Sequence, residues 1–61
     1  MSKLITAPNL ELPDDFYAKL IAAHDGKSDA QSEAYNARLI LVLANHIGDQ
    51  NILSEALATA Q

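Results

Sequence analysis

Residues 36–49 read Asn-Ala-Arg-Leu-Ile-Leu-Val-Leu-Ala-Asn-His-Ile-Gly-Asp, and the five large aliphatic residues at 39–43 decide the fold. From Ala37 to Ala44, every residue except Arg38 is apolar. Successive residues of a helix are rotated by about 100°, so these five side chains cover its whole circumference. A helix on the surface of a protein keeps a polar face, so we expect a buried central helix here. Two other short helices cannot wrap it, which predicts that another chain completes the core.

Length and charge narrow the possible classes of protein. The chain has 61 residues and no cysteine, so we expect one domain, without a disulfide framework or a thiolate metal site. Oligomerisation is the common remedy for so small a core. Eight acidic and four basic residues give a net charge of −4, which argues against a nucleic-acid-binding module. The acidic residues are spread along the chain, so an acidic DNA mimic is the weakest of the possible functions.

No segment of the sequence predicts a membrane span or secretion. The apolar run at 37–44 is too short to span a bilayer, and residues 1–5 lack the sustained apolar segment of a signal peptide. Together with the lack of cysteine, this predicts a cytoplasmic protein that does not bind membranes.

The N-terminal part is expected to be an extended arm over 1–12, followed by a helix over 13–25. Pro13 suits a first helical turn, and the two aspartates after it favour the positive end of the helix dipole. Gly26 supplies the left-handed residue that ends the helix. The arm contains several aliphatic residues, which either close one side of the helical core or bind a partner.

The remaining sequence predicts two more helices. Ser28 and Gln31 have the spacing of a capping box, Gly48 stops the second helix, and Asp49 caps the third. Short connections predict antiparallel neighbours. The expected fold is therefore all-α: an arm at 1–12 and a domain at 13–61, with helices at about 13–25, 29–47 and 49–60.

One side of the second helix is the candidate binding surface. Arg38 and Asn45 lie within about 20° of one line along the helix, Asp49 would continue that line, and aliphatic residues flank it. Apolar contacts with a few orienting hydrogen bonds are typical of a protein interface. The alternative is a solvated face whose arginine pairs with a neighbouring acid: Asp29, Glu33 or Asp49. The interface candidates are Tyr35, Arg38, Leu41, Val42, Asn45 and His46.

The two histidines and the serines favour no catalytic or metal site. His24 and His46 each stand two residues before a helix-ending glycine, where histidine interacts with the helix dipole and the free carbonyls. His46 at an interface is the main alternative, because a metal site with Asn45 and Asp49 would need a further donor. No serine has the context of a nucleophile, and no glycine-rich phosphate loop is present. We therefore expect no catalytic residue, cofactor or metal.

Residues 36–49, with 6–10 and 15–17, resemble a family of short uncharacterised bacterial proteins of about this length, a domain of unknown function. Members of this family are often encoded near flavin-dependent aromatic hydroxylases and ring-degrading enzymes. The resemblance implies a small accessory subunit and names no chemistry.

The sequence thus predicts a non-catalytic protein–protein interaction module. Its partner would be a second copy, in an obligate homo-oligomer, or a larger enzyme, of which it would be an accessory subunit. The alternative is a small-molecule-binding protein with an apolar cavity at its dimer interface.

Overall fold

The chain folds into three helices joined by short turns. The computed structural model describes residues 3–61, with α1 at Pro13–His24, α2 at Asp29–Ile47 and α3 at Gln50–Thr59. No strand occurs in this described part, so the predicted all-α class is confirmed. The predicted bounds of α2 match the observed ones, whereas the predicted end of α1 and both predicted ends of α3 differ from the observed ones by one residue.

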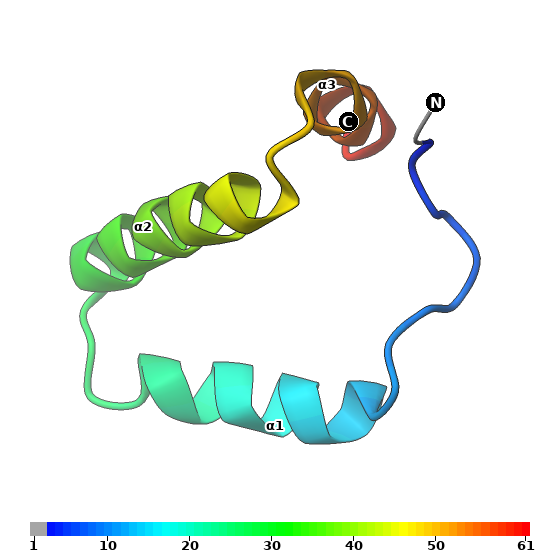
Figure 1. The fold of residues 1–61 in the computed structure, drawn as a ribbon. Helices are drawn as coiled ribbons and strands as arrows, with labels where there is room; N and C mark the ends of the chain where they lie inside the picture. Colours follow the sequence, from blue (N-terminus) through cyan, green and yellow to red (C-terminus); the bar gives the residue numbers. More distant parts are fainter. Residues whose placement is uncertain (1–2) are drawn as a thin grey trace.

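The three helices and the arm form an open ring rather than a compact bundle (Figure 1). α1 and α2 diverge from the turn that joins them, and the arm runs from the start of α1 back towards α3. The radius of gyration is 13.4 Å, whereas a compact chain of this length is expected at about 10.5 Å. The chain is therefore expanded for its size.

Short-range contacts fix the ends of α1. Pro13 occupies the first turn, with Asp14 and Asp15 next to it at the positive end of the helix dipole. The helix ends at His24, and Gly26 follows with a φ of 76°. Such a positive φ is readily adopted only by glycine, so the predicted stop signal is confirmed.

A capping box starts α2, as its sequence predicts. The backbone N–H of Gln31 donates to Oγ of Ser28 over 3.2 Å, and the Ser28 N–H donates to Oε1 of Gln31 over 2.9 Å. Two N–H groups that would otherwise lack partners at the start of the helix are thus satisfied.

A two-residue junction turns the chain between α2 and α3. Gly48 has a φ of 69°, and its N–H donates to the carbonyl of Ala44 over 2.9 Å. Asp49 then caps α3, since its Oδ1 accepts from the N–H groups of Asn51 (2.9 Å) and Ile52 (3.1 Å). In Figure 1, α3 is seen along its axis while α2 lies across the view, so these two helices are not the predicted antiparallel neighbours. The left-handed Gly48 and the extended Asp49 turn the chain so that α3 starts at a large angle to α2 and does not run back along it.

The chain by itself does not bury α2, so the predicted buried central helix is wrong for the single chain. No residue of the described part is buried, and Ile40, Leu41 and Val42 are 63%, 69% and 64% exposed. The physical reason is the divergence of α1 from α2, which leaves most of the length of α2 without a neighbour. That another chain covers these residues stays a prediction.

Candidate functional site

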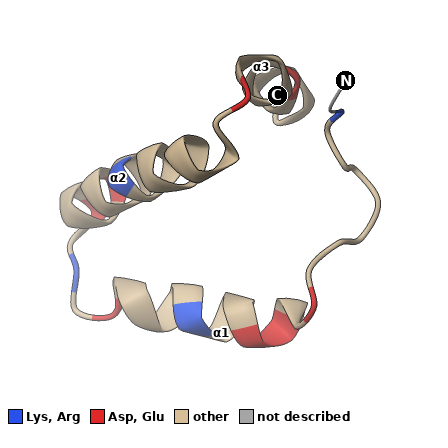
Figure 2. Cartoon of the chain, viewed as in Figure 1, with Lys and Arg blue, Asp and Glu red and all other residues tan. Residues whose placement is uncertain are grey.

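An apolar groove lies between α2 and α3. Its volume is about 500 Å³, and it is an open channel rather than an enclosed cavity. No charged residue contributes to its walls, and Figure 2 shows the C-terminal half of α2 without Lys, Arg, Asp or Glu. We call it the α2–α3 groove; its lining residues are Ile40, Leu43, Ala44, Ile47, Gln50, Leu53, Ala56, Leu57 and Ala60.

Both walls of this groove follow from helical spacing in the sequence. On α2 the wall residues are at positions 40, 43, 44 and 47, and on α3 at positions 53, 56, 57 and 60. Each set has the i, i+3, i+4, i+7 spacing that places side chains on one face of a helix. The signal was therefore in the sequence, but none of these residues is among the predicted interface candidates. Spacing alone does not say that two such faces meet.

The predicted line of Arg38 lies on the opposite side of α2 from the groove. Arg38 and Asn45 each precede a groove residue (Ile40 or Ile47) by two positions, which is a rotation of about 200° around the helix. Leu41, one position beyond Ile40, is turned from it by about 100°. All three predicted residues are exposed.

Two further candidates of this group have separate outcomes. Val42 is exposed like Arg38, so the aliphatic border of the line is open to a partner. Asp49 does not extend the line, because α2 stops at Ile47 and the carboxylate of Asp49 caps α3. The structure therefore keeps a shorter polar line, made of Arg38 and Asn45.

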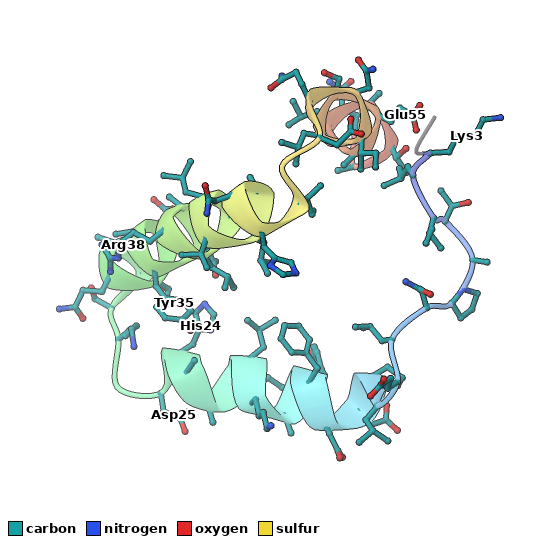
Figure 3. The ribbon with its side chains drawn as sticks, in the orientation of Figure 1. Lys3, His24, Asp25, Tyr35, Arg38 and Glu55 are labelled. Atoms are coloured by element: carbon teal, nitrogen blue, oxygen red, sulfur yellow. The ribbon has the colours of Figure 1, made fainter. Side chains whose placement is uncertain are left out.

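Tyr35 belongs to a cluster at the turn between α1 and α2 rather than to the Arg38 line. Its ring meets that of His24 edge to face, with centroids 5.2 Å apart and an interplanar angle of 75°. Nζ of Lys27 lies 5.0 Å from the centroid of the tyrosine ring, a cation–π distance. Figure 3 shows Tyr35 and His24 pointing towards one another between the two helices. No sequence signal joins these three residues, since the turn alone brings them together.

His24 ties the end of α1 to α2 through both ring nitrogens. Nδ1 donates to the carbonyl of Leu20, one turn earlier in α1, over 2.7 Å, whereas the predicted contact was with the free carbonyls of the last turn. Nε2 lies 2.8 Å from Oδ1 of Asn36. When the ring is neutral, Nε2 is an acceptor, and a half-turn of the Asn36 amide brings its NH₂ group to that nitrogen. The two polar side chains thereby hold the turn closed.

His46 lies apart from that cluster. It is exposed near the end of α2, and its ring makes no hydrogen bond within residues 3–61. Its predicted place at an interface stays a prediction. Within the same residues, no group of three or more His, Cys, Asp or Glu is arranged to hold a metal ion.

The arm contacts the helices near its start. The N–H of Leu4 donates to Oε2 of Glu55 on α3 over 3.1 Å, and Leu4 is half-buried. Figure 3 shows Glu55 beside this end of the arm. Ile5, Leu10 and Leu12 remain more than three-fifths exposed. One residue of the arm therefore closes the ring, and the other aliphatic residues stay open to a partner.

These features define a class of small helical protein whose apolar surfaces are not covered by its own chain. Residues 4–61 match the family described as "Protein of unknown function (DUF2783)". Because the match covers nearly the whole chain, the protein belongs to this family. No curated protein and no solved structure matches the chain. Within the described residues, no helix has the length and apolar character needed to cross a membrane.

Proposed function

We propose that this protein is a non-catalytic interaction module whose apolar helix faces are covered by another polypeptide. The observation that carries the proposal is the absence of any buried residue between 3 and 61. Burial of apolar surface is the main favourable term in folding, and this chain leaves most of its large aliphatic side chains in water. A covering polypeptide supplies the missing burial.

The partner is either a second copy or a larger protein. The resemblance to a family of short bacterial proteins supports a larger protein as the partner. In that arrangement the chain is a cytoplasmic accessory subunit of a flavin-dependent enzyme that degrades aromatic compounds. In this proposal the chain contributes contacts and the larger subunit contributes the chemistry.

The polar line of Arg38 and Asn45 supplies orientation in this proposal. An arginine presents a planar fork of donors that holds a carboxylate or a carbonyl pair in fixed geometry. The exposed Leu41 and Val42 on either side exclude water from such a contact. His46 and Tyr35 complete the predicted set, although Tyr35 acts within the chain at the turn.

Arg38→Ala tests the accessory role. Arg38 is exposed, so the variant should keep the helical circular dichroism spectrum of the wild type. Loss of a charged contact buried on binding typically costs about 2–5 kcal/mol. Calorimetric titration of the enzyme that co-purifies with the tagged chain should therefore show affinity lower by that amount. Lys19→Ala, which removes an exposed positive charge from α1, is the control. If Arg38→Ala binds with unchanged affinity, Arg38 and Asn45 form a solvated face rather than a binding surface.

A second candidate function rests on the α2–α3 groove. Its volume of about 500 Å³ falls within the range of roughly 300–1,000 Å³ for small-molecule sites, and its walls are apolar. When it is covered by a second chain, such a groove becomes an enclosed cavity for an apolar ligand. Titration with naphthalene separates the two functions: stoichiometric binding to the assembled protein favours the ligand site, and no binding favours a filled interface.

A further inference from the structure

The accessible area of the chain measures how much surface its partner must cover. The single chain exposes 5468 Å². A folded monomer of its 6.6 kDa mass is expected to expose about 3,900 Å². The excess is therefore about 1,600 Å² per chain. A standard interface covers only about 800 Å² on each partner, whereas obligate homodimers reach roughly 1,000–2,500 Å² on each. The missing cover has the size of an obligate interface.

We propose that a second copy of this chain supplies the cover, in a two-fold dimer in which α3 of each copy lies in the α2–α3 groove of the other. The inference rests on the proposed interaction function and names its partner. A chain without a core of its own needs a partner that is always present in equal amount, and a second copy meets that need. Two-fold dimers are also the commonest closed assembly of soluble proteins.

Charge favours the groove over the other surfaces as the two-fold contact. In such a contact, both copies use the same patch, so a charge near the two-fold axis lies close to the identical charge of the other copy and repels it. Each chain carries a net charge of −4, yet no residue that lines the groove is charged. The groove is thus a surface that two copies of an acidic chain can share without repulsion at its centre.

Leu57 is the residue that this arrangement inserts into the partner. It is 72% exposed, more than any other large apolar residue of the described part, and it lines the groove on the α3 side. In the dimer it meets Ile40 and Ile47 of the second copy, which are 63% and 47% exposed in the single chain. An aliphatic side chain that fills an apolar pocket of the partner can form the central anchor of an interface.

Sedimentation equilibrium of purified full-length protein at micromolar concentrations tests the proposal. The wild type should be a dimer, and Leu57→Glu should raise its dissociation constant roughly a hundredfold or more, because the carboxylate would be buried without a partner. Ala58→Glu is the matched control, since Ala58 is the next residue of α3, exposed and outside the groove. Leu41→Glu tests a face of α2 outside the groove, turned from Ile40 by about 100°. If Leu41→Glu separates the copies and Leu57→Glu does not, the groove assignment is overturned.

A second measurement covers the case in which Leu57→Glu fails to fold. The chain has no cysteine, so a disulfide in a single-cysteine variant joins two copies. An equimolar mixture of Leu57→Cys and Ile40→Cys chains should form a mixed disulfide under mild oxidation, because the proposed dimer places these two positions together. A mixture of Leu57→Cys and Leu41→Cys chains should stay mostly reduced at the same concentration, and equal yields from the two mixtures would overturn the groove as the contact.

The state of the wild-type chain also separates this inference from the proposed function. A monomer at every concentration overturns the second copy as partner. If that monomer binds the dye 1-anilinonaphthalene-8-sulfonate strongly, its apolar faces are open and the interaction function stands with a different protein as partner. A monomer that binds no dye and melts cooperatively overturns both.

Discussion

Replacement of Gly48 by valine should destabilise the protein through backbone strain alone. Gly48 has a φ of 69°, and a Cβ atom built there would lie 3.7 Å from the carbonyl oxygen of Asn45, an ordinary contact. No neighbouring atom thus forbids a side chain. The left-handed conformation itself costs an L-residue roughly 1–2 kcal/mol, and asparagine, which adopts it more readily, pays less.

The expected difference between Gly48→Val and Gly48→Asn is about 1 kcal/mol, which corresponds to a melting temperature lower by roughly 4–8 °C for valine in a domain of this size. Thermal melts followed by circular dichroism at 222 nm measure it. All variants are compared at one protein concentration, because association makes the melting temperature depend on concentration.

Ala58→Val is the control for valine in an ordinary helix. Ala58 is exposed on α3, so the change should cost only the helix propensity of valine, up to about 0.7 kcal/mol. If Gly48→Val melts at the same temperature as Gly48→Asn, the left-handed junction is not what sets the start of α3, and this reasoning is refuted.

Three further substitutions test the caps and the turn. Ser28→Ala removes the acceptor of the capping box and should lower the free energy of unfolding by about 1 kcal/mol in urea titrations, whereas Ser28→Asp should restore most of it. Asp49→Ala removes the acceptor of two N–H groups and should cost about 1–2 kcal/mol in the same titration; Asp49→Ser with the same loss would argue against the cap. His24→Phe keeps the edge-to-face contact with Tyr35 but loses both polar contacts of the ring, and it should cost about 1–3 kcal/mol. If the free energy of unfolding of His24→Phe equals that of the wild type, the ring contact with Tyr35 alone holds the turn.

Local sequence was enough to place the helices of this protein. The signals that start and end the helices depend on groups within four residues of each other. They are the capping box at Ser28, the glycines at 26 and 48, and the Asp49 cap, and they set the bounds of α2. Such contacts form inside a single helical turn, so they are legible from spacing.

The sequence also predicted that the aliphatic residues at 39–43 need cover, but not what covers them. Helix periodicity places these side chains around α2 without fixing the direction in which α1 and α3 leave it. That direction is set by a few backbone dihedrals at the two turns. As a result, α1 and α3 diverge too far from α2 to wrap it.

Only the tertiary structure decided which surfaces exist. It separated Tyr35 from Arg38 by turning the tyrosine onto His24, and it took Asp49 away from the Arg38 line into the cap of α3. It also brought the apolar faces of α2 and α3 together as a groove, although each face alone was visible in the sequence. The physical reason is that a helix face is a property of one element, whereas a site requires the crossing of two, and the junction at Gly48 and Asp49 sets that crossing.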